Sequence, residues 1–148
     1  MALTDMVERP KDRPIMATIL GDAGMGKTRL AASFPKSIFI RAEDGMQSIP
    51  VDARPDAFET LSGVDMLWKQ LTALIHEQHD YKTLVIDSVT QLEALIWKQV
   101  CNDNNWKSIE EPGYGKGYIE TDRLWRDFIK AVTWLRDNKA MNIVMIGH

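Results

Sequence analysis

Residues 21–28, with the sequence GDAGMGKT, constrain the fold of this chain more than any other stretch. They match the pattern G-x-x-x-x-G-K-[ST] at every fixed position. Such a loop wraps a polyphosphate with backbone N–H groups, which requires glycine where the backbone comes closest to the anion. The pattern predicts a phosphate-binding loop made of Gly21, Asp22, Ala23, Gly24, Met25, Gly26, Lys27 and Thr28. Lys27 would reach the β- and γ-phosphates, and the Thr28 hydroxyl would bind Mg²⁺.

The sequence on either side of this loop has the order that a phosphate-binding loop needs. Residues 15–20 are apolar and predict a short buried strand, and residues 27–34 predict a helix that ends before Pro35. The alternative is a glycine-rich turn between a strand and a helix that binds nothing. The complete pattern and its two flanks favour the phosphate-binding interpretation.

Length and composition predict one soluble domain. The chain has 148 residues, 45% of them hydrophobic and 26% charged, which is enough to bury a core. We expect residues 1–12 to form a flexible tail and residues 13–148 to form the core. A net charge of −3 argues against a protein that binds nucleic acid over its whole surface, but it allows a local basic site.

The cysteine content and the length of the apolar runs indicate the cellular compartment. A single cysteine, Cys101, cannot form an internal disulfide, which fits a reducing cytoplasm. No apolar run approaches the roughly 20 residues that a membrane-spanning helix needs. The prediction is a cytoplasmic protein with no membrane partner.

Apolar strands alternate with amphipathic helices along the rest of the chain. Strands are predicted at residues 37–41, near Val51, at 83–88 and at 142–148. One helix is predicted at 62–79, and a second begins at residue 89 and frays at 102–105. A loop is predicted at 110–118, and a long helix follows it. This pattern predicts a three-layer α/β fold, a parallel sheet with helices on both faces. Ligands of such sheets bind at the carboxyl ends of the strands, where the loop, Glu43, Asp87 and His148 are expected to converge.

Asp87 ends the apolar strand at residues 83–88, in the place where P-loop NTPases hold Mg²⁺. The alternative role is the capping of the helix that follows, which Asp87 or Ser88 could perform. We expect Asp87 to bind the metal together with Thr28, and Ser88 to cap the helix.

Hydrolysis needs a residue that positions or deprotonates the attacking water. Many P-loop ATPases place a glutamate directly after the metal-binding aspartate, but Ser88 stands there in this chain. Glu43, at the end of a neighbouring strand, is the best-placed carboxylate, and Asp44 is its rival; a solvated acidic turn is the alternative. His148 ends the last strand, where a polar residue could sense the γ-phosphate, or it is simply an exposed histidine.

The segment at residues 113–118, GYGKGY, places tyrosines and glycines around a lysine. Bases of single-stranded nucleic acid stack on tyrosine, and lysine meets the phosphate backbone. Tyr114, Lys116 and Tyr118 are therefore candidate nucleic-acid contacts, with an ordinary surface loop as the alternative.

Taken together, these residues resemble the RecA-like branch of P-loop ATPases, and most closely a phage and prophage nucleotide-binding family that includes RecA-like single-strand annealing ATPases. The resemblance runs from Ile15 to His148. It implies that Glu43 polarises the attacking water and that His148 is the polar sensor. Ser88 follows the metal-binding Asp87, as a serine does in that branch. The resemblance also implies that residues 113–118 lie where the first DNA-binding loop lies. In that family the chain continues beyond the sensor strand, so the native protein is expected to be longer.

The function predicted from the residues and the resemblance is an ATP-binding, Mg²⁺-dependent ATPase in phage DNA recombination or single-strand annealing. ATP is favoured over GTP because residues 138–141, NKAM, lack the aspartate of the guanine-reading pattern. Predicted partners are ATP and ADP, single-stranded DNA, and further copies or recombination and replication proteins. Two alternatives stay open: a nucleotide-dependent scaffold or loading partner that does not hydrolyse ATP, and a P-loop kinase of small molecules.

Overall fold

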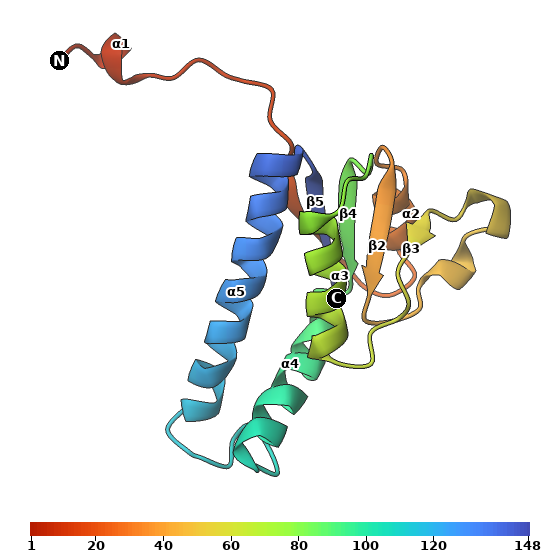
Figure 1. The fold of residues 1–148 in the computed structure, drawn as a ribbon, viewed down its shortest axis with the longest axis vertical. Helices are drawn as coiled ribbons and strands as arrows, with labels where there is room; N and C mark the ends of the chain where they lie inside the picture. Colours follow the sequence, from red (N-terminus) through yellow and green to blue (C-terminus); the bar gives the residue numbers. More distant parts are fainter.

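A computed structural model describes the whole chain, residues 1–148. Five strands form one sheet in the order β1-β5-β4-β2-β3 (Figure 1). Their bounds are Met16–Leu20 for β1, Ser37–Arg41 for β2, Asp56–Ala57 for β3, Thr83–Asp87 for β4 and Asn142–Gly147 for β5. All neighbours are parallel, as the sequence predicts. β5 lies between β1 and β4, so the strand before the glycine-rich loop and the strand that ends in Asp87 are separated by one strand.

The helices cover both faces of the sheet, which confirms the predicted three-layer α/β fold (Figure 1). α3, α4 and α5 pack on one face, and α2 packs on the other. Their bounds are Lys27–Ala32 for α2, Val64–His76 for α3, Val89–Asn104 for α4 and Lys116–Lys139 for α5. No helix in the structure is both long enough and apolar enough to cross a membrane.

The apolar strands serve two cores because successive side chains of a strand point to opposite faces. In β2, Ile38 and Ile40 join the core under α3, α4 and α5, whereas Phe39 joins the core under α2. Phe39 and Phe128 of α5 are both fully buried. Burial on both sides explains why β2 and β4 are nearly continuous apolar runs rather than alternating ones.

Two helix ends differ from the sequence prediction. Ser62 and Asp65 form an S-x-x-D pattern, which predicts a helix start at Ser62. The N-cap of α3 is Gly63 instead, and the Ser62 hydroxyl donates to Sδ of Met66. The fraying predicted at residues 102–105 is also wrong: α4 continues to Asn104, whose side-chain amide donates to the carbonyl of Val100.

Two loop predictions are corrected as well. The strand predicted near Val51 is a short 3₁₀ helix, η2, at Val51–Ala53, and the strand β3 follows it. The loop predicted at residues 110–118 ends earlier, because α5 begins at Lys116. Lys116 and Tyr118 therefore belong to the first turn of a helix, and only Tyr114 of the three candidate contacts lies in the loop.

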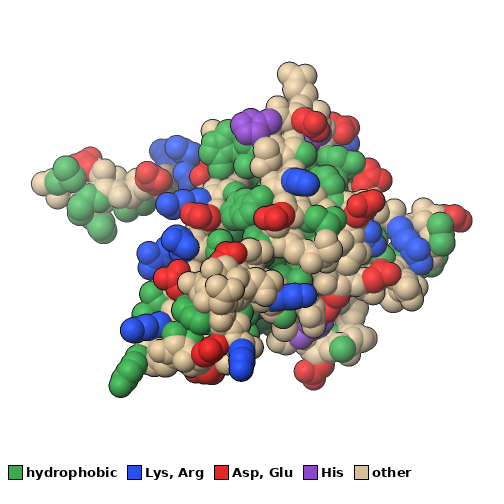
Figure 2. All heavy atoms as spheres, turned by 60° about the horizontal axis from the view of Figure 1, so that its bottom comes forward, with side chains coloured by type: hydrophobic (Ala, Val, Ile, Leu, Met, Phe, Trp, Pro, Cys, Tyr) green, Lys and Arg blue, Asp and Glu red, His purple; other side chains and the backbone are tan.

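The N-terminal residues form an arm that leads away from the body of the domain (Figure 1). It contains one short helix, α1, at Leu3–Met6, with no buried residue. On the face shown in Figure 2, basic and acidic side chains are interspersed rather than separated into fields of one sign. A surface of this kind agrees with the expectation that nucleic acid, if bound, meets a local site.

Candidate functional site

The glycine-rich loop joins the carboxyl end of β1 to the start of α2. Gly24 and Gly26 have φ values of +82° and +89°, a region that residues with a side chain rarely adopt. Gly26 is the N-cap of α2, so the chain enters the helix at Lys27 directly from a left-handed turn. Glycine is thus required at positions 24 and 26 by the backbone path of this loop, as well as by any anion that it cradles.

Lys27 is buried, with 7% of its surface exposed. Its ammonium donates to the backbone carbonyls of Gly21 and Asp22, the second at 2.8 Å. The side chain therefore lies back across the loop that precedes it. Phosphate oxygens placed within the loop would compete with these carbonyls for the three donors of the ammonium.

Thr28 and Asp87 meet across the sheet edge. The Thr28 hydroxyl donates to Oδ2 of Asp87 at 2.9 Å. Asp87 is almost fully buried, and this burial raises the pKa of its carboxyl above the ordinary value, with the nearby charge of Glu43 acting in the same direction. The hydrogen bond from Thr28 and the positive charges of His148 and Lys27 lower the pKa in part. A cation between Thr28 and Asp87 would favour the ionised carboxylate and offset the cost of burying it.

Ser88, next to Asp87, caps α4: its hydroxyl accepts a hydrogen bond from Gln91 N at 3.2 Å. The predicted capping role of Ser88 is confirmed. The Asp87–Ser88 peptide bond is cis.

Gly45 forms the wall opposite Thr28 and Asp87. A Cβ atom added to Gly45 would lie 3.0 Å from Oγ1 of Thr28 and 3.1 Å from Oδ2 of Asp87. The backbone at Gly45 therefore leaves open a small space that borders two oxygen ligands suited to Mg²⁺. No group of three His, Cys, Asp or Glu side chains that could hold a metal occurs in the chain. The donor set fits Mg²⁺, which uses one or two protein ligands and completes its octahedron with substrate phosphates and water.

Glu43 and His148 form a pair at the same edge. Nε2 of His148 lies 2.5 Å from Oε1 of Glu43, and both side chains are about one-third exposed, at 31% and 29%. The backbone N–H of His148 donates to Oγ1 of Thr90 in the first turn of α4. The ends of β2, β5 and α4 are thereby joined beside the glycine-rich loop.

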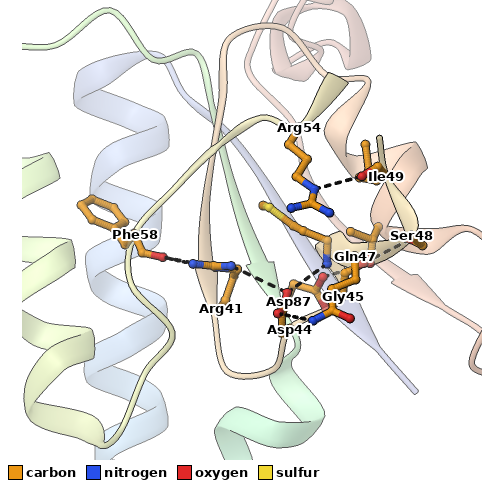
Figure 3. A network of polar contacts seen from close by, with 11 residues as sticks. Arg41, Asp44, Gly45, Gln47, Ser48, Ile49, Arg54, Phe58 and Asp87 are labelled. Carbon is orange, nitrogen blue, oxygen red and sulfur yellow. Dashed lines mark hydrogen bonds and ion pairs between the residues drawn. The ribbon is translucent and has the colours of Figure 1, made fainter. Parts of the chain in front are cut away.

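Asp44, the rival of Glu43, has other partners. Its carboxylate lies 3.7 Å from Nη1 of Arg41 and accepts hydrogen bonds from the backbone of Met46 and the side chain of Gln47 (Figure 3). These contacts hold the short 3₁₀ helix η1, Met46–Ser48, against the end of β2. Asp44 therefore organises the turn, whereas Glu43 contacts a second polar side chain of the site.

Most of these groups line one cavity of about 340 Å³, and Asp87 adjoins it through its hydrogen bond with Thr28. Its walls come from the glycine-rich loop, α2, the turn after β2, and the end of β5: Ala23, Gly24, Gly26, Lys27, Thr28, Arg29, Glu43, Asp44, Gly45, Ser48 and His148. A hollow of about 510 Å³ elsewhere is lined by five residues of α5 alone, so side chains do not converge on it from different elements. The smaller cavity gathers the polar groups that a binding site requires.

The candidate nucleic-acid residues lie apart from this cavity. α4 and α5 extend beyond the carboxyl edge of the sheet, and the connection between them lies at the far end of this helical pair (Figure 1). Tyr114 is 98% exposed there. The Tyr118 hydroxyl donates to Glu110, which raises the pKa of the phenol, and its ring packs edge-on against Trp97. Of the three candidate contacts, Tyr114 and Lys116 are therefore exposed, whereas Tyr118 is held by Glu110 and Trp97.

Sequence patterns do not identify three further residues of this region. They are Gly45, Thr90 and Arg29, and each contacts a segment that is distant in the sequence. Arg29, for example, donates from Nη2 to the Ser48 carbonyl at 2.6 Å. The only local signal is the position of Gly45, two residues beyond Glu43 in a turn after a strand.

Comparison with known proteins supports a P-loop assignment. A search of curated proteins returned no match. A family model described as "AAA domain" matches residues 13–148, which include every strand and every residue of the cavity described above. The chain therefore belongs to the AAA domain family of P-loop nucleotide-binding ATPases.

Proposed function

We propose that this chain binds ATP with Mg²⁺ in the cavity beside the glycine-rich loop and hydrolyses it to ADP and phosphate. The observation that carries the proposal is the convergence of Lys27 and Thr28 of α2, Asp87 of β4 and Glu43 of the turn after β2 on one sheet edge, from three separate segments. A phosphate-binding loop alone would support binding. The addition of a buried carboxylate beside Thr28 and a second carboxylate across the cavity supports catalysis.

Each residue has a role that its surroundings support. The loop N–H groups and the Lys27 ammonium would hold the phosphates, and Thr28 with Asp87 would hold Mg²⁺. The bound metal would neutralise the charge of the β- and γ-phosphates. Gly45 keeps the metal position free of a side chain.

Glu43 is the proposed base. Its carboxylate would accept a proton from the attacking water as the water oxygen bonds to the γ-phosphorus and the bond to the bridging oxygen breaks. Asp44 is a weaker candidate because Arg41, Met46 and Gln47 already occupy its oxygens. The contact with Glu43 would let His148 report whether the γ-phosphate is present, since its imidazole can bond either group.

The decisive experiment measures phosphate release from ATP by the wild-type chain and by Glu43→Gln, with and without single-stranded DNA. We expect the wild type to turn over ATP, and Glu43→Gln to bind Mg²⁺–ATP with similar affinity but to release little phosphate. ATP binding without turnover by the wild type would support the scaffold or loading alternative. Phosphate transfer that depends on a small acceptor would support the kinase alternative.

The DNA-related part of the proposal is supported by the exposed Tyr114 and by the charge next to it. Lys116 is the first residue of α5, which begins two residues after this tyrosine, and Arg123 lies seven residues further along the same helix. A base stacked on Tyr114 would place its phosphates near these cations. We infer a role on single-stranded DNA in recombination or annealing, in agreement with the resemblance described above, and stimulation of hydrolysis by DNA is its test.

The remaining proposals concern the setting of this activity. Residues 13–148 would act as the ATPase core, with residues 1–12 as an appended tail, and the matched family range has the same boundary. Assembly into a homo-oligomer, or with recombination and replication proteins, in the cytoplasm of a phage host is the proposed context.

A further inference from the structure

A second polar network lies behind the turn that carries Glu43 (Figure 3). Its centre is Arg41, the last residue of β2, whose side chain is only 20% exposed. Nε and Nη2 of Arg41 donate to the carbonyl of Phe58 at 3.2 and 2.9 Å, and Nη1 lies 3.7 Å from Oδ1 of Asp44. One guanidinium thus connects the segment after β3 with the turn after β2.

The backbone around Glu43 is tied to the candidate metal-binding strand. The N–H groups of Ala42 and Glu43 both donate to the carbonyl of Asp87, at 2.8 and 3.3 Å. The N–H of Leu61 donates to the carbonyl of Arg41 at 2.8 Å. The segment before Glu43 is therefore held on one side by β4 and on the other by the residues that follow β3.

The ion pair between Arg41 and Asp44 spans Glu43 in the sequence. Asp44 in turn accepts hydrogen bonds from the backbone N–H of Met46 and from Gln47, at 3.4 and 3.2 Å. Arg41 and Asp44 thus flank Glu43 and hold each other, so the turn that carries Glu43 is closed by this ion pair. Glu43 is left with the cavity and His148 as its surroundings.

We propose that Arg41 is a positioning residue, which holds Glu43 at the distance and angle required for water activation without touching substrate itself. This inference rests on the proposed ATPase function. The planar fork of a guanidinium can serve a carbonyl and a carboxylate at once, whereas a lysine ammonium is a point charge on a flexible stem. Arg41→Lys keeps the positive charge but loses the planar guanidinium. Arg41→Met keeps an unbranched side chain but loses the contacts with the Phe58 carbonyl and the Asp44 carboxylate.

Steady-state hydrolysis of ATP by the wild type, Arg41→Met, Arg41→Lys and Arg54→Met tests the proposal. Arg54 is the matched control, because it also donates to a backbone carbonyl in this region, that of Ile49, but has no contact with the turn at Glu43 (Figure 3). Misplacement of a catalytic group by about 1 Å costs on the order of 100-fold in rate. We expect kcat to fall between about 10- and 100-fold in Arg41→Met and less in Arg41→Lys, with KM within about threefold of the wild type. Arg54→Met should keep the wild-type kcat.

The double variant Arg41→Met, Glu43→Gln separates positioning from a general loss of structure. If Arg41 acts through Glu43, the residual rate of Glu43→Gln does not fall further when Arg41 is replaced. A wild-type kcat in Arg41→Met, or the same fold-loss in the Glu43→Gln background as in the wild type, overturns the proposal.

A measurement without turnover distinguishes failure of this inference from failure of the proposed function. The chain has three histidines, so the His148 imidazole signals can be assigned by NMR with a His148→Ala variant. If the wild type does not hydrolyse ATP, the proposed activity fails, but the geometry is still tested. His148 signals that change in Arg41→Met in the same direction as in Glu43→Gln support the positioning role; unchanged signals overturn it.

Discussion

The hydroxyl of Thr28 donates a hydrogen bond of 2.9 Å to Oδ2 of Asp87, 59 residues further along the chain. Thr28 lies in the first turn of α2, which follows β1 and the glycine-rich loop, and Asp87 ends β4; β1 and β4 are not neighbours, because β5 lies between them. The contact depends on the glycine-rich loop, which brings the first turn of α2 back over the sheet edge toward β4. It defines where Mg²⁺ is proposed to bind.

Lys27→Ala should abolish detectable binding of ATP. Truncation of one partner of a buried, hydrogen-bonded charge pair costs about 2–5 kcal/mol, which corresponds to a large loss of affinity. Thermal denaturation with increasing Mg²⁺–ATP measures the effect. An upward shift of the melting temperature equal to that of the wild type would contradict the assignment of the phosphate-binding loop.

Gly45→Ala should weaken binding of Mg²⁺–ATP by about 5- to 150-fold and should affect metal-free ATP less, because steric crowding at this level costs about 1–3 kcal/mol. The added Cβ would lie 3.0 and 3.1 Å from the two candidate metal ligands and would occupy the space beside them. Calorimetric titration with ATP in Mg²⁺ and in EDTA measures both affinities. Gly63→Ala, at a glycine with open space around it, is the control. Equal losses in the two titrations would show that Gly45 serves the loop rather than the metal.

Asp87→Asn should raise the melting temperature of the nucleotide-free protein at neutral pH and remove stabilisation by Mg²⁺–ATP. Burial raises the pKa of Asp87 in the folded state, so the folded chain binds more protons than the unfolded chain between the ordinary pKa and the raised one. The free energy of unfolding therefore falls as the pH increases through this window, and the amide variant lacks that decline. Melting curves in EDTA from pH 3.5 to 8 measure it.

Asp80→Asn is the control, because the pKa of Asp80 is lowered in the folded protein whereas that of Asp87 is raised. A hydrogen bond from Lys36 and the charge of that residue lower the pKa of Asp80. Its contribution to stability is present above the ordinary aspartate pKa and is lost as the pH falls through the lowered value. If both variants changed the pH dependence in the same direction, the burial argument for Asp87 would be wrong.

Replacement of Tyr114 and Lys116 by alanine should weaken binding of labelled single-stranded DNA by about 1–3 kcal/mol for the stacked base, with a reduced dependence on salt. Tyr118→Ala should have a smaller effect on binding, because its hydroxyl is bonded to Glu110 and its ring packs on Trp97. Fluorescence polarisation at several salt concentrations compares the variants. The same affinity in all of them would remove this loop from the proposed DNA interface.

Gly117→Ala should destabilise the fold by about 1–3 kcal/mol. A Cβ at this position would collide with the backbone carbonyl of Ile109, so the start of α5 would have to move away from the loop. Chemical denaturation measures the change. Ile119→Ala, two residues later at an exposed site, should stay within about 0.5 kcal/mol of the wild type.

The parts of the site that could be predicted from the sequence are those encoded locally. The glycine-rich loop and the strand ending in Asp87 are continuous patterns, and the alternation of apolar strands and helices was sufficient to predict the parallel sheet. Gly45 and Arg41 could not be assigned roles, because both act through contacts with residues that are distant in sequence.

Errors at helix ends have a similar physical origin. The three glycines of GYGKGY predict a loop and a later start of α5, whereas the close approach of Ile109 makes Gly117 necessary inside the helix. Ser62 resembles an N-cap in the sequence, but its hydroxyl contacts Met66 instead. Propensity alone does not contain these tertiary contacts.

The position of β5 has a consequence for synthesis of the protein. β5 joins β1 to β4, and it follows all the other strands in the sequence. When only residues 1–141 have left the ribosome, the nascent chain contains the phosphate-binding loop and Asp87, but β1 has no neighbouring strand to pair with. Residues 142–147 must leave the ribosome before β1 and β4 can be joined in one sheet, so ATP bound at the proposed site can stabilise the fold only after β5 has been synthesised.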